Sequence, residues 1–197
     1  MFPHFLPRGL LYEIAILDLI VRDKLSRLFP SFKQSWWHQI VPGLYLGGIP
    51  LSDQNHLEQI KFLGAGSVLA ILEDDEAENE TFFSTPVREH EWRASGIDYR
   101  RLSCPDMHPM SMEELEESIL WLNEQVEAGR TVYVHCKAGR GRSAMIVLAY
   151  LIVFQKMNLQ DAIAYLSSIR SVVRFRPSQL ERLEEFVTSN NLCHSRA

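Results

Sequence analysis

The chain has 197 residues, 46% of them apolar, and a formal net charge of −5 at pH 7. This length and apolar content predict one domain with a single sizeable core, and no internal repeat or low-complexity tract indicates another architecture. The three cysteines do not form the pattern of a disulfide-rich secreted protein, so we expect an intracellular protein in a reducing compartment.

The first thirty residues are predicted to form an amphipathic helix. Charged residues interrupt its apolar run, which falls short of the ~20 apolar residues that a membrane-spanning helix needs. The segment lacks the features of a cleaved signal peptide, and it is more acidic than a transit peptide. It is interpreted as a helix packed on the domain or as an interfacial helix on a membrane, and its mixed charges favour packing. Between Gly9 and Phe29 the apolar residues at helical spacing are Leu10, Ile14, Leu17, Val21, Leu25 and Leu28.

Strands and helices are predicted to alternate along the rest of the chain. The predicted strands are residues 44–46, 67–72, 98–102 and 131–135. The predicted helices are residues 53–62, 84–94, 111–127, 142–154, 159–169 and 178–187. This alternation indicates an α/β fold, with a mainly parallel central sheet flanked by helices and a ligand at the carboxyl ends of the strands. The predicted division is an N-terminal helix at 1–30, a catalytic domain at 31–190 and a tail at 191–197.

The segment from Thr131 to Ser143 carries the strongest functional pattern. A β-branched run ends at His135-Cys136, five residues lead to Arg142-Ser143, and an apolar helical run follows. This order predicts a strand, a tight loop and a helix N-terminus, where backbone N–H groups and the helix dipole favour an oxyanion. A cysteine at the base of the loop places a thiolate beneath that anion. The pattern therefore indicates a phosphatase with a cysteine nucleophile.

Each residue type in this phosphate loop has a chemical reason. Loop amides, the helix terminus and Arg142 favour the thiolate form of Cys136. Arg142 can grip two phosphoryl oxygens in a bidentate fork, which a lysine cannot reproduce. Ser143 is expected to hydrogen-bond the sulfur and make it a better leaving group, and His135 to orient the loop backbone. The intervening residues are expected to bind the phosphate, with the two glycines keeping bulk away from it: Lys137, Ala138, Gly139, Arg140 and Gly141.

The leaving group needs a proton, so a carboxylic acid must approach from another loop. Asp106 directly follows the predicted strand at 98–102 and lies between two prolines, on the sheet edge where Cys136 is expected. It would act as acid when the thiolate attacks and as base for the water that clears the intermediate. A surface turn aspartate is the alternative interpretation, Asp74 and Asp75 are rivals after their own strand, and His108 is expected to be only a loop residue.

Two acidic runs, at 73–80 and 113–117, hold ten of the 25 acidic residues and no basic residue. The rest of the chain therefore has more basic than acidic residues, and the active-site face can still attract an anion. The run at 73–80 is predicted to be a solvated loop. We expect no metal and no cofactor, because phosphocysteine chemistry requires neither, and no nucleic-acid partner.

With these motifs the chain resembles the protein-tyrosine-phosphatase-like phosphatases that dephosphorylate phosphatidylglycerophosphate, in mitochondria, plants and bacteria, within the dual-specificity cysteine phosphatases. The Cys136-five-Arg142-Ser143 spacing alone is typical of the wider group. The tryptophan pair Trp36-Trp37 and the run from Arg176 to Gln179 point to the narrower family. The matches with that family are Trp36-Trp37-His38, Leu44-Tyr45-Leu46-Gly47, Glu73-Asp74-Asp75-Glu76, Leu102-Ser103, Asp106-Met107, Val134 to Ser143, Ile169-Arg170-Ser171, Arg176-Pro177, Gln179 and Glu185-Phe186.

The resemblance implies a dual-specificity-phosphatase-like fold, with Cys136 as nucleophile, Arg142 as phosphate ligand and Asp106 as general acid. It also implies a lipid phosphate as substrate and a membrane-associated N-terminal segment. The chain departs from the family pattern where Pro105 precedes the acid and where Asp75 replaces an aromatic residue. The expected location is the cytoplasm or the periphery of a membrane, which would be the mitochondrial inner membrane in a eukaryote.

For three residues outside the loop, the sequence leaves two possible roles open. Arg174 and Arg176 are candidates for a second phosphate or an anionic headgroup, or they are solvated charges at a helix end. Gln179 could position the hydrolytic water, although an exposed place in the first helical turn is favoured.

Three further residues, two tryptophans and a cysteine, are given structural roles. Trp36 and Trp37 are expected to pack in the core, with an interfacial wedge as the alternative. Cys104 is a candidate for a disulfide with Cys136 under oxidation.

Three functions remain. They are a lipid phosphomonoesterase acting on phosphatidylglycerophosphate or a phosphoinositide, a dual-specificity protein phosphatase, and a non-catalytic phosphate-binding adaptor. The first is favoured, and the third is disfavoured because a binding module needs no nucleophile. A monomer with possible peripheral membrane contact is assumed.

Overall fold

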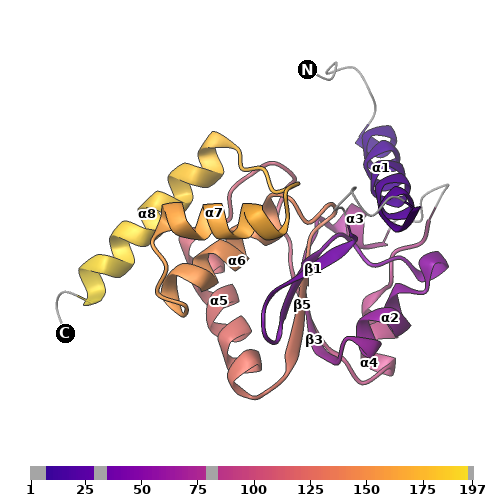
Figure 1. Cartoon of the computed structure of the whole chain (residues 1–197), viewed down its shortest axis with the longest axis horizontal. Helices are drawn as coiled ribbons and strands as arrows, with labels where there is room; N and C mark the ends of the chain where they lie inside the picture. The colour runs from indigo at the N-terminus through magenta and orange to yellow at the C-terminus, as the bar shows by residue number, and fades with distance from the viewer. Residues whose placement is uncertain (1–7, 29–34, 79–83, 195–197) are drawn as a thin grey trace.

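A five-stranded sheet forms the centre of the computed structural model, which describes residues 8–28, 35–78 and 84–194 (Figure 1). The strand order is β1-β2-β5-β3-β4, and all neighbours pair in parallel except β1 and β2. The mainly parallel sheet predicted from the sequence is therefore confirmed. The strands are β1 (Trp37–Val41), β2 (Leu44–Gly47), β3 (Ala65–Ile71), β4 (Asp98–Leu102) and β5 (Thr131–His135).

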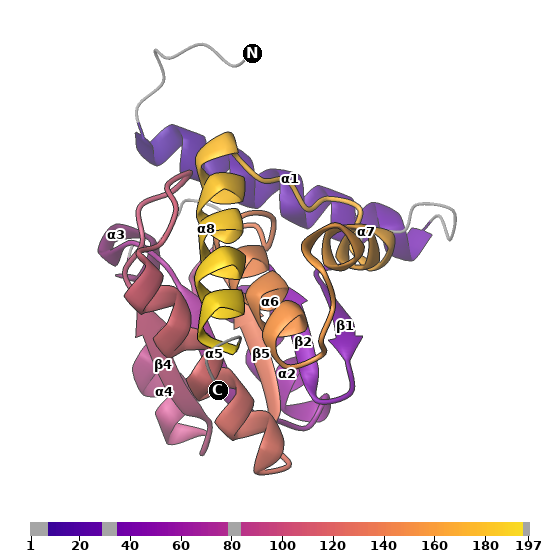
Figure 2. The ribbon, with the colours of Figure 1, turned by 90° about the vertical axis from the view of Figure 1, so that its left-hand side faces the viewer.

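Helices cover both faces of this sheet (Figures 1 and 2). On one face lie α5 (Met112–Glu127), α6 (Arg142–Val153), α7 (Leu159–Ile169) and α8 (Pro177–His194), whose apolar side chains join the larger core cluster. On the other face lie α1 (Arg8–Leu28), α2 (His56–Phe62) and α4 (Glu89–Ala94), which build the second cluster with the opposite side of the strands. Two short elements complete the order, η1 (Ser52–Gln54) and α3 (Asp74–Glu78).

The central position of β5 fixes the place of the phosphate loop. Val132, Tyr133 and Val134 are fully buried, and β5 pairs with β2 on one side and β3 on the other. The apolar helix α6 begins at Arg142, where the loop ends, and its first ten residues are all buried. The loop therefore opens at the carboxyl end of the middle strand, which is where parallel α/β sheets bind their ligands.

Several predicted boundaries differ from the structure. β1 was not predicted; it is an antiparallel edge strand paired with β2 through an irregular register. The helix predicted at 84–94 begins only at Glu89, and Pro86 instead bridges to Leu51. The predicted tail at 191–197 is helical as far as His194, since α8 continues past the predicted end. The acidic run contains the helix α3, and residues 79–83 lie outside the described residues.

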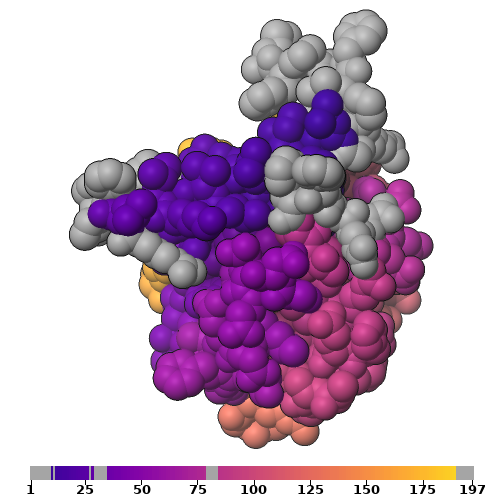
Figure 3. All heavy atoms as spheres, turned by 90° about the vertical axis from the view of Figure 1, so that its right-hand side faces the viewer, coloured from indigo at the N-terminus to yellow at the C-terminus, as the bar shows by residue number. Residues whose placement is uncertain are grey.

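The N-terminal helix α1 packs on the domain through a face other than the predicted apolar stripe. Ile16, Leu19 and Ile20 are buried in the second core cluster. The stripe residues Leu10, Ile14, Leu17 and Val21 are instead 41–46% exposed. In Figure 3, α1 runs as a ridge across the upper part of the molecular surface. In the described part of the chain, no helix is long and apolar enough to cross a membrane.

Candidate active site

Cys136 lies at the base of the phosphate loop, with only 3% of its surface exposed. The Ser143 hydroxyl donates a hydrogen bond to its sulfur at 3.2 Å. Burial raises the pKa of the thiol. The Arg142 charge and hydrogen bonds from the Ser143 hydroxyl and from the N–H groups of Ser143 and Arg140 outweigh it and hold the pKa below its ordinary value. The loop therefore favours the thiolate that nucleophilic attack requires.

Gly139 permits the loop to turn tightly against the sheet. Its φ is +63°, and a Cβ there would lie 2.2 Å from the carbonyl oxygen of Gly47. No side chain fits such a position. Gly141 has an ordinary φ, but a Cβ there would approach the Gln179 side chain to 3.3 Å. Both glycines are thus explained by close approach, and Gly139 also by its backbone angle.

Arg142 is buried at the start of α6 and is held by Glu76 of α3. Its two terminal nitrogens donate to the two carboxylate oxygens of Glu76, at 2.6 and 3.0 Å, and Nη1 also donates to the Cys104 carbonyl at 2.9 Å. Its Nε is buried and has no protein partner among the described residues. The guanidinium is therefore fixed in orientation and retains one free donor for a phosphoryl oxygen.

The buried position of Glu76 contradicts one prediction made from the sequence. The acidic run at 73–80 was expected to be a solvated loop, yet Glu76 is buried beneath the phosphate loop. A buried carboxylate needs a cationic partner, and Glu76 has two, since Lys137 Nζ also lies 3.2 Å from Oε1. Only the spacing of Glu76 after a strand whose carboxyl end faces the loop could have indicated its role.

Asp106 reaches the phosphate loop from the turn after β4, as its position in the sequence predicted. Oδ2 accepts from Lys137 Nζ at 2.6 Å, and Oδ1 lies 3.3 Å from Arg142 Nη2. Its backbone N–H donates to Glu73 Oε1 at 2.6 Å. Burial raises the carboxyl pKa, but Arg142 and Lys137 outweigh it and hold the pKa below its usual range. Asp106 is therefore ionised here and pairs with both Arg142 and Lys137.

The rival acids do not reach the site. Asp74 is exposed and pairs with Arg101 at 2.7 Å, and Asp75 is also exposed. His108 is exposed in the loop, with Nδ1 2.9 Å from the Asp106 carbonyl. His135 is buried, and burial lowers its pKa to about 3, so it is neutral beside the loop backbone.

Gln179 was expected to be exposed, and this prediction is wrong. It is buried at the start of α8, donates to the His108 carbonyl at 3.3 Å and accepts from the Arg176 N–H at 3.0 Å. Its amide therefore joins the acid loop to α8 and lies against Gly141 of the phosphate loop.

The guanidinium groups of the remaining predicted anion-binding arginines have partners other than Cys136. Arg174 Nη1 donates to the carbonyls of Ser171 and Val173, and Arg176 Nη2 lies 3.2 Å from Met107 Sδ on the acid loop. The Arg140 guanidinium pairs with Asp18 of α1 at 2.8 Å. In the described structure these three guanidinium groups are thus paired with backbone carbonyls, a thioether sulfur or the Asp18 carboxylate.

The sequence patterns assign no role to Arg170. It is buried after α7, where Nε donates to the Gly139 carbonyl at 2.8 Å and Nη2 to the Ala138 carbonyl at 3.1 Å. Nη1 donates to the Ser35 carbonyl and to His38 Nδ1, whose pKa burial and the Arg170 charge lower to about 4. Arg170 therefore holds the loop backbone in place at Ala138 and Gly139.

The two tryptophans and Cys104 are also placed. Trp36 is buried in the second core cluster, as predicted, and Trp37 packs at its edge against the His56 ring. Cys104 is a buried free thiol whose pKa burial raises to about 11, so it is far less reactive than Cys136. Among the described residues, no group of three or more His, Cys, Asp or Glu side chains is arranged to hold a metal ion.

Comparison with known proteins agrees with this geometry. Residues 44–189 match the model of the dual specificity phosphatase catalytic domain. The chain belongs to this family. It is 34% identical over 154 residues to human phosphatidylglycerophosphatase and protein-tyrosine phosphatase 1, which covers 78% of this chain and 74% of the relative. It is 31% identical over 178 residues to phosphatidylglycerophosphate phosphatase PTPMT2 of Arabidopsis thaliana, covering 90% of this chain and 72% of that one.

The fold of this dual specificity phosphatase is also found among solved structures. The crystal structure of PTPMT1 in complex with PI(5)P superposes with a TM-score of 0.71 and 32% sequence identity, covering 81% of this chain and 99% of the other. The predicted resemblance to phosphatidylglycerophosphatases is confirmed. The chain is a phosphoric monoester hydrolase of the protein-tyrosine-phosphatase type.

Proposed function

We propose that this enzyme removes the phosphate monoester of a phospholipid headgroup, phosphatidylglycerophosphate or a phosphoinositide, through a phosphocysteine intermediate. The observation that carries the proposal is the second cation of the site. Lys137 places an ammonium group next to both Asp106 and Glu76, where a headgroup with several anionic oxygens would meet it. Relatives named as phosphatidylglycerophosphatases and a PTPMT1 structure containing PI(5)P support this substrate class.

The first step uses the groups that surround Cys136. The thiolate attacks phosphorus as the bond between phosphorus and the ester oxygen breaks, and Arg142 donates to an equatorial oxygen through its free Nε. The leaving alkoxide takes the proton of Asp106. In the second step water attacks the phosphocysteine, Asp106 takes a proton back, and the sulfur leaves as a thiolate stabilised by the Ser143 hydroxyl.

Asp106 must therefore gain a proton after substrate binds. In the free enzyme it is paired with Lys137 and Arg142, which depress its carboxyl pKa. A bound phosphate dianion takes both cations and adds negative charge nearby, which raises that pKa again. Binding of the substrate is thus what converts Asp106 into an acid.

The test is phosphate release by the purified enzyme from three sets of substrates: phosphatidylglycerophosphate, phosphoinositides and phosphopeptides. The Cys136→Ser variant is the control and should release none. Preference for either lipid set supports the proposal. Preference for phosphopeptides would make the enzyme a protein phosphatase, an activity that the names of its relatives also include. No release from any set would support the adaptor alternative.

The exposed stripe on α1 supports peripheral contact with the membrane that holds such a lipid. Four apolar side chains, Leu10, Ile14, Leu17 and Val21, project from one side of the helix away from the core. The fraction of the protein that sediments with anionic vesicles should fall when Ile14 and Leu17 are both replaced by Ser. The buried free thiols of Cys104 and Cys136 support a reducing compartment at that surface, and we propose that a monomer acts there.

A further inference from the structure

The N-terminal helix α1 lies outside the matched catalytic-domain region, which begins at residue 44, yet it contacts the phosphate loop. Asp18 Oδ2 accepts from Arg140 Nη2 at 2.8 Å, and Asp18 Oδ1 accepts from Arg22 Nε at 2.5 Å. The carboxylate therefore bridges Arg22 of the same helix to Arg140 of the loop, which is 122 positions from Asp18.

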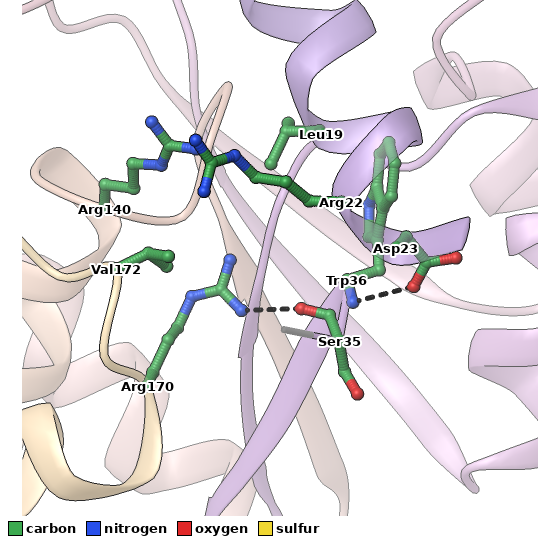
Figure 4. Close-up of a pocket in the computed structure, with 8 residues that line it drawn as sticks. All are labelled: Leu19, Arg22, Asp23, Ser35, Trp36, Arg140, Arg170 and Val172. Atoms are coloured by element: carbon green, nitrogen blue, oxygen red, sulfur yellow. Dashed lines mark hydrogen bonds between the residues drawn. The ribbon is translucent and has the colours of Figure 1, made fainter. Parts of the chain in front are cut away.

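This bridge is anchored on both sides. Beneath Asp18, the side chains of Ile16, Leu19 and Ile20 are buried in the second core cluster, so α1 cannot shift without opening that core. Figure 4 shows the Arg140 and Arg22 side chains reaching toward each other across a small pocket, with Leu19 of α1 above and Arg170 on the opposite wall. On the loop side, the Arg140 carbonyl accepts from the Arg174 N–H at 2.9 Å.

Arg140 matters to the reaction through its backbone. Its N–H is one of the hydrogen-bond donors that lower the pKa of Cys136. Nothing else in the described structure pairs with its guanidinium, whose Nε has no partner there. Partial burial opposes ionisation of Asp18, but the hydrogen bonds from Arg140 and Arg22 hold its pKa below the usual value, so the bridge is charged at neutral pH.

A second contact from the same helix reaches the other loop cation. Lys137 Nζ lies 5.7 Å from the ring centroid of Tyr12, and the Tyr12 hydroxyl donates to the Glu76 carbonyl at 3.4 Å. One helix outside the matched region thus contacts Lys137 and Arg140 of the loop and the segment that holds Arg142.

We propose that Asp18 is a positioning residue for the phosphate loop, which holds Arg140 so that its backbone N–H remains directed at the Cys136 sulfur. The proposal rests on Cys136 being the nucleophile, but not on the substrate being a lipid. It makes the activity of the catalytic domain depend on the N-terminal helix.

The two effects of removing this carboxylate have opposite signs. By electrostatics alone, loss of a negative charge near the sulfur would favour the thiolate and the bound phosphate. By positioning, the freed loop would weaken the Arg140 hydrogen bond and disfavour the thiolate. Among the described residues, the groups that interact electrostatically with Cys136 are Arg142 of α6, Arg170 after α7, Cys104 after β4 and Tyr133 of β5, and the substitution changes none of them.

The experiment uses the full chain, a small aryl phosphate as substrate and the Asp18→Asn variant. We expect kcat/KM to fall about fivefold, because a hydrogen bond between charged groups is lost at a partly exposed site. The pH midpoint of Cys136 alkylation by iodoacetamide, with the Cys136→Ser protein as background, should move upward. Asp18→Glu should recover part of both effects.

Matched variants separate positioning from stability. Glu89→Gln breaks an exposed ion pair of similar helical spacing on α4 and should change neither quantity. In an Arg140→Gln background, Asp18→Asn should have no further effect, because Asp18 acts through Arg140. An unchanged or lower alkylation midpoint with full activity would overturn the proposal. A Cys136→Ser protein that remains active would instead overturn the nucleophile assignment.

Discussion

Two buried arginines contact the phosphate loop, and their partners differ in kind. Arg142 faces the Glu76 carboxylate through two hydrogen bonds, so a negative charge offsets it. Arg170 donates to three backbone carbonyls and to His38, and in the described structure no carboxylate pairs with it. The first arginine is held in orientation by this carboxylate, and its Nε is left free for a ligand. Arg170 uses its donors on the loop backbone, and its positive charge acts on Cys136 without a carboxylate among the described residues to offset it.

This difference predicts distinct consequences for replacing each arginine or its partner. Loss of the ligand-facing arginine should remove transition-state stabilisation, and loss of the loop-facing arginine should loosen the geometry on which every loop donor depends.

The largest effect is expected for Arg142→Lys. An ammonium group cannot form the bidentate fork to Glu76 and still direct a donor at the phosphoryl oxygens. We expect kcat to fall about a thousandfold, with a much smaller change in KM. Steady-state kinetics on an aryl phosphate measures both parameters. The control is Arg182→Lys, because Arg182 lies on α8 and pairs with Glu185 away from the loop. A kcat loss below tenfold would mean that Arg142 only provides charge.

The next effect is expected for Glu76→Gln. The change leaves Arg142 and Lys137 without a shared carboxylate, and breaking a buried pair from one side costs about 3 kcal/mol. We expect that loss in the free energy of unfolding, and a fall in kcat/KM of about a hundredfold because Arg142 is no longer oriented. Urea denaturation and kinetics measure the two effects. Asp74→Asn, on the same helix but exposed, is the matched control and should preserve both quantities.

Arg170→Met should affect stability as much as catalysis. It leaves the carbonyls of Ala138 and Gly139 without their donor in a buried site, at a cost of about 1–3 kcal/mol for each group. We expect a lower free energy of unfolding and kcat/KM reduced about thirtyfold. Lys61→Met on the surface of α2 should stay within about 0.5 kcal/mol of the parent. Normal kinetics in a destabilised Arg170→Met protein would show that the loop holds its shape without this arginine.

The smallest effect is expected in the pH dependence. Lys137 and Arg142 depress the pKa of Asp106 in the free enzyme, and a bound phosphate relieves that depression. The alkaline limb of kcat should therefore lie at higher pH than the alkaline limb of kcat/KM. In Lys137→Met one cation is gone, the Asp106 pKa rises in the free enzyme, and the limb of kcat/KM should move toward higher pH. Coincident limbs in the parent enzyme would contradict the proposed exchange of partners.

The sequence predicts the local part of this site well. Strand β5, the loop and helix α6 are contiguous, so spacing and residue type alone place Cys136, Arg142 and Ser143 together. Asp106 could be anticipated because it follows a parallel strand whose carboxyl end lies on the same edge as that of β5.

The partners that hold the loop could not be predicted in the same way. Glu76, Arg170 and Asp18 lie far from the loop in sequence, and Glu76 sits in an acidic run whose composition is typical of a solvated surface. Their roles depend on tertiary contacts, which local periodicity does not report. For the same reason the apolar pattern of α1 predicted a helix but indicated the wrong buried face, because the helix has apolar residues on both sides.

The most direct test of the account is mass spectrometry of the enzyme quenched in acid during turnover of an aryl phosphate. We predict that the peptide containing Cys136 gains the mass of one phosphoryl group, that this adduct accumulates when Asp106 is replaced by Ala, and that it is absent in Cys136→Ser. A phosphoryl group on any other residue, or turnover by Cys136→Ser at a rate near that of the parent, would contradict the assignment of Cys136 as the nucleophile.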